Sequence, residues 1–310
     1  MTSLERPGTA ELIERINDLR RGRRAFILAH NYQLPEVQDI ADFVGDSLAM
    51  AREAAKVRAD AIVLCGVHFM AETAKLLNPG RAVLEPDPNA GCPMADMVTP
   101  RELAEAKARH PDAAVVTYVN SSAAVKAMSD ICCTSANAVE IVNSLPRERP
   151  ILFVPDQCLG DYVAEKTGRT NIFLWPGFCP THHRILAEHV AARRREHPDA
   201  EVCAHPECTR DVRAAADFIG STGQIIRHVA ASPGSNFIIA TELGVCHTMR
   251  RQNPGKTIIE VTHLADCPNM KLNTLEKVLW SLEDMRFEVT IPEEVAAGAR
   301  RAIERMLAVR

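Results

Sequence analysis

The stretch Gly91-Cys92-Pro93-Met94 contains a dipeptide that recurs at Cys179-Pro180 and Cys267-Pro268, at steps of 87 and 88 residues. Each copy follows a short apolar run of the kind that forms a buried strand. A motif that recurs at a fixed spacing must be recognised first, because it decides how the whole chain is divided. The spacing predicts a threefold internal repeat of about 88 residues.

Two further polar positions recur with the same period. One ends a strand-like run 61 or 62 residues before each cysteine, and the other is a hydroxyl residue 17 positions later. Ligands of parallel α/β units bind at the carboxyl ends of the strands, so these positions are expected to face one site. The strand-end residues are His30, Tyr118 and His205, and the hydroxyl residues are Ser47, Ser135 and Thr222.

Short apolar strands alternate with amphipathic helices through each repeat, as in the strand 61–65 followed by the helix 69–77. This alternation predicts an α/β fold with parallel sheets that are covered by helices on both faces. We expect three homologous three-layer αβα lobes around a pseudo-threefold axis, with the active site at the centre. The predicted lobes are residues 1–97 with 270–310, residues 98–180, and residues 181–269.

Several segments between the repeated motifs are predicted as single helices. These are residues 136–145, 183–195 and 208–218, with the hydroxyl residues placed at helix starts. The chain beyond the third repeat is predicted to form a helix over 273–285, a strand over 287–289 and a helix over 293–307, and to pack back on the first lobe.

Composition excludes several classes of function. The net charge of −4 and the absence of a long basic run give no electrostatic basis for binding nucleic acid or a membrane surface. Residues 1–8 lack the pattern of a secretory signal, and no apolar run approaches the length of a membrane span. We therefore expect a cytoplasmic protein whose ten cysteines are thiols or metal ligands and not disulfides.

The three repeated cysteines favour an iron–sulfur cluster over zinc. A structural zinc site usually takes four protein ligands, often in Cys-x-x-Cys pairs, and none of these three cysteines belongs to such a pair. Three thiolates holding a cubane cluster would leave one iron open as a Lewis acid, which suits the elimination of water. The remaining cysteines are interpreted as buried packing residues: Cys65, Cys132, Cys133, Cys158, Cys203, Cys208 and Cys246.

The polar residues near the three strand ends predict a cavity for a small polyanion. Histidine, tyrosine and glutamate side chains at these positions can move protons and polarise carbonyl groups. Hydroxyls at helix starts can add anion binding, because free amides and the helix dipole favour negative charge there. The strand-end set is His30, Tyr32, Tyr118, Asn120, His205 and Glu207.

The repeated motifs resemble those of the quinolinate synthase family over most of the chain. The similar segments are His30-Asn31-Tyr32-Gln33, Gly45-Asp46-Ser47-Leu48, Gly91-Cys92-Pro93-Met94-Ala95-Asp96-Met97, Tyr118-Val119-Asn120-Ser121-Ser122, Cys133-Thr134-Ser135, Trp175-Pro176-Gly177-Phe178-Cys179, His205-Pro206-Glu207-Cys208, Gly220-Ser221-Thr222 and Cys267-Pro268-Asn269-Met270-Lys271.

The resemblance implies condensation of iminosuccinate with dihydroxyacetone phosphate to give quinolinate, phosphate and two waters in de novo NAD biosynthesis. It implies a [4Fe-4S] cluster on Cys92, Cys179 and Cys267, and functional coupling to an aspartate-oxidising enzyme. Implied substrate contacts are His30, Ser47, Tyr118, Asn120, Ser135, His205, Glu207 and Thr222. Implied catalytic residues are Tyr118, His30, Tyr32, Glu207, His205 and His182, and Glu242 lies in a family motif near the chemistry.

One departure and two alternatives qualify this interpretation. Some members carry Cys-x-x-Cys-x-x-Cys at the third ligand, whereas this chain has Val261 and Leu264, so no thiol–disulfide switch is expected there. Other three-lobed, three-cysteine enzymes are the diphthamide-synthesis radical enzymes and the reductase of isoprenoid diphosphate synthesis, which do not share the strand-end motifs. A non-catalytic cluster-binding sensor would need a basic helix or an extra domain for its partner.

Overall fold

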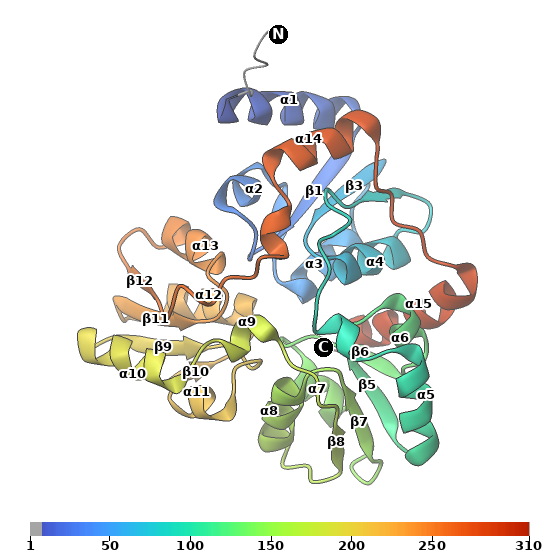
Figure 1. Ribbon diagram of the computed structural model, residues 1–310, viewed down its shortest axis with the longest axis vertical. Helices are drawn as coiled ribbons and strands as arrows, with labels where there is room; N and C mark the ends of the chain where they lie inside the picture. Colours follow the sequence, from blue (N-terminus) through green and yellow to red (C-terminus); the bar gives the residue numbers. More distant parts are fainter. Residues whose placement is uncertain (1–7, 310) are drawn as a thin grey trace.

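The computed structural model describes residues 8–309, so the N-terminal prediction for residues 1–8 falls almost wholly outside them. Three four-stranded parallel sheets surround a common centre, one for each repeat (Figure 1). Their strands are β1 (Ala25–His30), β2 (Phe43–Gly45), β3 (Ala61–Cys65) and β4 (Ala82–Leu84); β5 (Ala114–Tyr118), β6 (Ile131–Cys133), β7 (Ile151–Val154) and β8 (Ile172–Leu174); and β9 (Glu201–Ala204), β10 (Phe218–Ile219), β11 (Asn236–Ala240) and β12 (Thr257–Glu260).

Strand order is the same in all three sheets. The spatial orders are β2-β1-β3-β4, β6-β5-β7-β8 and β10-β9-β11-β12, so the first strand of each repeat lies between the second and the third. Central strands such as β3 and β5 are buried along their whole length, as parallel strands covered on both faces must be. The predicted α/β fold of three αβα lobes is confirmed, while the residue boundaries between lobes remain a prediction.

Helices cover both faces of the sheets. The first two repeats contain α1 (Thr9–Gly22), α2 (Pro35–Ile40), α3 (Ser47–Ala54), α4 (His68–Leu77), α5 (Pro100–Arg109), α6 (Ala123–Ala127), α7 (Ala138–Asn143) and α8 (Gln157–Thr167). The remainder contains α9 (Pro180–His183), α10 (Ala187–Glu196), α11 (Arg210–Ala214), α12 (Thr222–Ala231), α13 (Val245–Gln252), α14 (Leu275–Asp284) and α15 (Glu293–Ala308), and short 3-10 turns at Ala95–Met97 and Met270–Leu272.

An aspartate directly precedes one edge strand of each lobe, β2, β6 or β10, and makes the same contacts each time. One residue of the neighbouring strand is its partner twice. The aspartate carboxylate accepts a hydrogen bond from the backbone amide of this residue, and the aspartate amide donates to the carbonyl of the same residue. The pairs are Asp42 with Ile27 (2.8 Å), Asp130 with Val115 (2.9 Å) and Asp217 with Val202 (2.8 Å). Each aspartate precedes a repeated hydroxyl residue by five positions, which is a signal that the sequence analysis missed.

This aspartate explains one wrong helix prediction. The predicted helix over 208–218 is in fact α11 followed by β10, because Asp217 holds the chain beside β9 and Phe218 pairs with Cys203 in the sheet. The short strand β2 and helix α2 were missed altogether, because so few residues give no clear periodicity.

Three further predictions are corrected. The helix over 183–195 is divided between α9 and α10, because Leu186 is extended and buried Ile185 turns into the core. Helix α7 is shorter than 136–145, because the Asn137 side chain accepts from the Thr134 amide and shapes a turn before it. The strand over 287–289 is only an isolated antiparallel bridge between Leu84 and Glu288.

The C-terminal helices divide between two lobes. Helix α14 packs on α1, where Leu12 and Ile16 meet Val278 and Leu282, as expected for packing on the first lobe (Figure 1). Helix α15 packs mainly against α6 and β6 of the second repeat and also contacts α4 of the first, where Arg300 Nε donates to the Leu76 carbonyl at 2.8 Å, so it bridges two lobes. Among residues 8–309, no helix combines the length and apolarity needed to cross a membrane.

Close approach of α15 to α6 depends on Gly298, and replacing it tests the packing. A Cβ at Gly298 would lie 2.8 Å from the Ala127 carbonyl oxygen and 3.1 Å from its Cα. Overpacking of this kind costs about 1–3 kcal/mol, against a gain in helix propensity of about 1 kcal/mol. We expect Gly298→Ala to lower the free energy of unfolding by about 1 kcal/mol in urea titrations. The control Gly22→Ala meets nothing within 4 Å and should not be destabilising; equal effects of the two changes would contradict this account.

Candidate active site

A cavity of about 450 Å³ lies where the three lobes meet, and every predicted site residue lines it. The first lobe supplies the strand end of β1, the second that of β5, and the third that of β9. The predicted residues along its wall are His30, Tyr32, Ser47, Cys92, Tyr118, Asn120, Ser135, Cys179, His182, His205, Glu207, Thr222, Glu242 and Cys267. The structure thus brings together residues that are far apart in the sequence.

The same backbone hydrogen bond holds each cysteine loop. In every lobe, an amide three residues after the third strand donates to a carbonyl two residues before the cysteine. These bonds are His68 N to Ala90 O (2.8 Å), Gln157 N to Gly177 O (2.8 Å) and Leu243 N to Ala265 O (3.1 Å). The same backbone hydrogen bond, repeated in each lobe, therefore places the three cysteines at the cavity.

The three thiols suit a cofactor that spans more than one metal ion. Burial raises the pKa of Cys92 to about 12 and also raises the pKa of Cys179 and Cys267, so metal binding must displace protons. Their sulfur atoms do not form one of the groups within 4.8 Å of one another that could hold a single ion. Three thiols from three lobes around one cavity are a donor set that could hold a metal cofactor.

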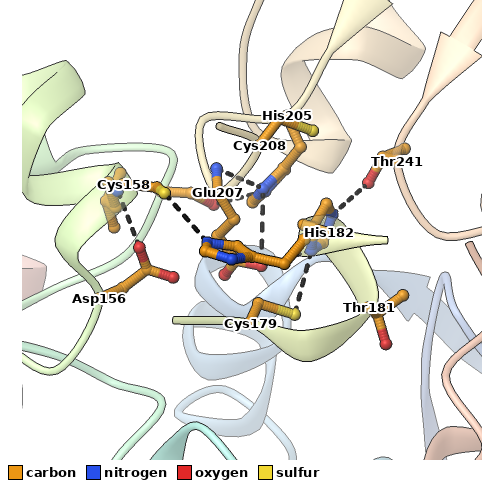
Figure 2. Close-up of polar contacts among 12 residues, drawn as sticks. Asp156, Cys158, Cys179, Thr181, His182, His205, Glu207, Cys208 and Thr241 are labelled. Carbon is orange, nitrogen blue, oxygen red and sulfur yellow. Dashed lines mark hydrogen bonds and ion pairs between the residues drawn. The ribbon is translucent and has the colours of Figure 1, made fainter. Parts of the chain in front are cut away.

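Glu207 links the acid–base groups of the second and third lobes. The Tyr118 hydroxyl donates to Glu207 Oε1 at 2.6 Å, and His182 Nδ1 lies 2.7 Å from Glu207 Oε2. His182 Nε2 lies 2.9 Å from the Thr241 hydroxyl, and its Nδ1 is also 3.1 Å from Cys179 Sγ (Figure 2). Burial opposes ionisation of Glu207, but the adjacent His182 and the hydrogen bonds from His182 and Tyr118 outweigh it and lower the pKa of this carboxyl.

Two histidines are held in equivalent orientations at their strand ends. The Tyr32 amide donates to His30 Nδ1 at 3.2 Å, and the Glu207 amide donates to His205 Nδ1 at 3.3 Å. Burial lowers the pKa of His30 to about 4 and that of His205 to about 3, so both rings are neutral near pH 7. Because Nδ1 accepts, the proton resides on Nε2, which can donate to a substrate oxygen; His205 Nε2 lies 3.2 Å from the Ser135 hydroxyl.

Tyr32 ties the first lobe to the third. Its hydroxyl lies 2.8 Å from the hydroxyls of both Thr222 and Thr241. Burial raises the pKa of Tyr32 well above its usual value, so the phenol is protonated. Thr241, which also contacts His182, was not identified from the sequence, because it has no equivalent among the repeated polar positions.

The helix starts are less free for anions than predicted. The sequence predicts a helix start at Asp46-Ser47, and Asp46 is the N-cap of α3, but its contacts with the third lobe were not predicted. It accepts from the Ala49 amide in its own lobe, and from the Ser221 hydroxyl and the Gly223 amide of the third lobe. Ser47 and Thr222 do begin α3 and α12, whereas Ser135 lies in the turn before α7.

A buried ion pair positions the third cysteine. Glu242 accepts from the Cys267 amide at 3.1 Å and from the Gly244 amide at 2.7 Å. Lys271 Nζ lies 2.8 Å from Glu242 Oε1 and also donates to the Tyr32 carbonyl of the first lobe. Since Glu242 is fully buried, this pair fixes the Cys267 loop between two lobes.

Fold and site together define a three-lobed α/β enzyme whose acid–base residues and three cysteines share a central cavity. The family described as Quinolinate synthetase A protein matches residues 14–308. Quinolinate synthase from Dehalococcoides mccartyi (strain CBDB1) is 53% identical over 300 residues, covering 96% of this chain and 99% of that protein. Quinolinate synthase 1 from Methanosarcina acetivorans is 52% identical over 301 residues, covering 97% and 98%.

One solved structure shows a weak likeness to this chain. The E-1-hydroxy-2-methyl-but-2-enyl-4-diphosphate reductase of Plasmodium falciparum is 12% identical with a TM-score of 0.31, covering 92% of this chain and 90% of that one. This value is too low to support an argument about fold or function. The family match and the two relatives, which extend over nearly the whole chain, decide the assignment: the chain belongs to the quinolinate synthetase A protein family.

Buried neutral histidines should make the protein less stable in mild acid. Unfolded histidine titrates near 6.5, whereas folded His30 titrates at about 4. Between these values the unfolded state binds more protons, so the free energy of unfolding falls as the pH is lowered, by up to about 1.4 kcal/mol per pH unit for each such histidine. We expect His30→Gln to flatten this slope in urea unfolding measured from pH 6.5 down to 4.

His68 provides the control of opposite sign. A hydrogen bond to Glu85 raises the pKa of His68, so its contribution to stability is lost as the pH rises. His68→Gln should therefore leave the acid slope in place. If both variants flatten the slope equally, the assignment of the effect to the buried His30 is wrong.

Removing the charge of Glu242 should loosen the Cys267 loop. Glu242→Gln keeps the side-chain shape but removes the 2.8 Å ion pair with Lys271, whose side chain is 20% exposed and keeps Asp266 at 3.8 Å, so the change should cost about 1–3 kcal/mol in urea unfolding. We also expect Cys267 to react faster with a thiol reagent. Glu260→Gln, which removes the exposed pair with Arg250, should cost less than about 1 kcal/mol and leave the thiol rate unchanged. Equal changes in the two variants would contradict the positioning role.

Proposed function

We propose that this chain is a quinolinate synthase of NAD biosynthesis, which condenses iminosuccinate with dihydroxyacetone phosphate. Membership of the quinolinate synthetase A family supports this activity. The single structural observation that supports it most is the convergence of three cysteines and the acid–base residues on one cavity. The two substrates together contain the atoms of quinolinate, one phosphate and two waters, so the reaction needs acid–base chemistry and no net oxidant.

Neutral donors would bind the carboxylates of the imino diacid. His30 and His205 each present Nε2–H, and the fixed bond at Nδ1 orients the ring before substrate arrives. Among the described residues, Asn120 Oδ1 is buried without a hydrogen-bond partner, so a substrate N–H or O–H would satisfy it. The Ser47 and Ser135 hydroxyls, with Arg184 at the cavity wall, would contact the phosphate end.

Tyr118, Glu207 and His182 would move protons. Glu207 holds the Tyr118 phenol at 2.6 Å on one oxygen and His182 at 2.7 Å on the other, so a proton accepted by one group can be passed to the other. Enolisation, carbon–carbon bond formation and two dehydrations each need such a transfer. Tyr32, held between Thr222 and Thr241, would orient the substrate from the first lobe.

Cys92, Cys179 and Cys267 would hold a [4Fe-4S] cluster. Such a cluster with an open iron supplies Lewis-acid assistance to the loss of water. A second donor set could instead hold a single metal ion. It consists of Cys179, His182 and Glu207, each of which has one ligand atom within 4.8 Å of those of the other two. Iron and sulfide counts separate these two alternatives.

Iminosuccinate must come from a reaction that oxidises aspartate, which accounts for the expected functional coupling.

Anaerobic reconstitution tests this proposal. We expect the protein loaded with iron and sulfide to form quinolinate from iminosuccinate and dihydroxyacetone phosphate. Cys179→Ser should lose both cluster and product. Tyr118→Phe should keep the cluster, but product formation should be slower by about 10²–10⁴-fold, since it removes the proton donated to Glu207.

The matched control is Cys246→Ala, which removes a buried helix thiol of the third lobe and should keep both cluster and product. If the protein holds a cluster, forms no quinolinate and cleaves adenosylmethionine, the proposed activity is wrong and the chain acts as a radical enzyme instead. A folded protein that binds no iron, or one iron without sulfide, would overturn the three-cysteine assignment.

A further inference from the structure

A second group of metal-binding side chains lies on the third lobe outside the central cavity. Glu201 and Cys203 are two positions apart on β9 and therefore point to the same face of the strand. His228 lies on α12, which covers that face. One ligand atom from each of the three residues lies within 4.8 Å of the other two. The spacing is that of donors able to hold one ion.

Neighbouring contacts already orient two of these side chains. His228 Nε2 is hydrogen-bonded to Glu201 Oε1, and the Ser232 hydroxyl donates to Glu201 Oε2 at 3.2 Å. The His228 ring stacks on Phe218 with centroids 3.9 Å apart and planes inclined by 9°. Ser232 and Phe218 hold the carboxylate and the ring from outside the group, as outer contacts do in metal sites, whereas the His228–Glu201 bond joins two of the three donors.

The internal repeat shows that this group is special to one lobe. Because His205, His30 and Tyr118 are equivalent strand ends, the positions of Glu201 and Cys203 correspond to Phe26 and Leu28 in the first lobe and to Ala114 and Val116 in the second. The two other lobes thus fill this layer with apolar side chains. Only the third replaces them with a carboxylate and a thiol, and places an imidazole opposite.

Charge and access also favour a cation. Carboxylates of Glu201 and Asp217 lie close enough to Cys203 to add to the effect of burial in raising the pKa of its thiol. Glu201 and His228 keep 27% of their side-chain surface exposed, so an ion can reach them from solvent, whereas the thiol is buried. Two positive groups nearby are already bound: the Lys256 ammonium to the carbonyls of Val229 and Ser232, and the Arg194 guanidinium to Asp217 at 2.7 Å.

We propose that Glu201, Cys203 and His228 form a second metal site for a borderline-soft divalent cation of the zinc type, with water as fourth ligand. Imidazole, thiolate and carboxylate are the donors that zinc takes in a tetrahedral site. Binding releases the thiol proton, so it tightens as the pH rises. The ion links β9 to α12. His205 directly follows β9 and Thr222 begins α12, and both residues line the central cavity, so the ion stabilises two parts of its wall.

Cobalt(II) is a suitable probe, because its bond to a thiolate gives an intense near-ultraviolet absorption. The full chain is titrated with cobalt(II) without oxygen, and bound metal is counted after dialysis. Relative to the unaltered protein, Cys203→Val and His228→Gln are each expected to bind one cobalt fewer per chain. Zinc should raise the melting temperature of the unaltered protein more than that of either variant.

Cys65→Val is the matched control, because it removes an equally buried strand thiol from the first lobe. The cavity cysteines are the same in all four proteins, so the difference in bound cobalt reports on the proposed site whether or not the chain makes quinolinate. Equal cobalt counts and spectra in all four proteins would show that Glu201 and His228 form an ion pair only and would overturn the proposal. If Cys203→Val does not fold, His228→Gln, which changes a partly exposed side chain, decides.

Discussion

The backbone hydrogen bond from the end of each third strand to each cysteine loop is the constraint on which the rest of the site depends. It appears three times with the same donors and acceptors, at His68, Gln157 and Leu243. Because the loop is held at its peptide backbone, the sheet sets the course of the cysteine loop in every lobe, and in the third lobe Glu242 adds a side-chain contact to the Cys267 amide. The three lobes can therefore differ in their other polar residues without moving the cysteines.

The three lobes share one backbone fold but carry different side chains at equivalent positions. At the equivalent strand ends, His30 and His205 kept the same ring orientation, whereas Tyr118 replaced the ring in the second lobe. The residues two positions after the third strands are Val67, Asp156 and Glu242, of which Glu242 acquired Lys271 as its counter-ion. Equivalent backbone positions in the three lobes thus carry different sets of side chains around one cavity.

Burial sets the protonation states in the cavity. The imidazoles of His30 and His205 are neutral and the phenols of Tyr32 and Tyr118 are protonated, because charge is costly away from water. Glu207 is the exception, since His182 and Tyr118 satisfy both of its oxygens. A buried carboxylate held between a phenol and an imidazole is suited to accept and return protons while the neutral donors hold anionic groups.

The sequence by itself determined the threefold repeat, the α/β lobes, the three cysteines and the strand-end residues, because each depends on local pattern or on a spacing that recurs. The tertiary structure decided what joins the lobes. The contacts of Asp46 with Ser221 and of Tyr32 with Thr241, and the packing of α15 on α6, pair residues with no shared periodicity. Their proximity follows from how three sheets pack around one centre, and no pattern along a single chain records that arrangement.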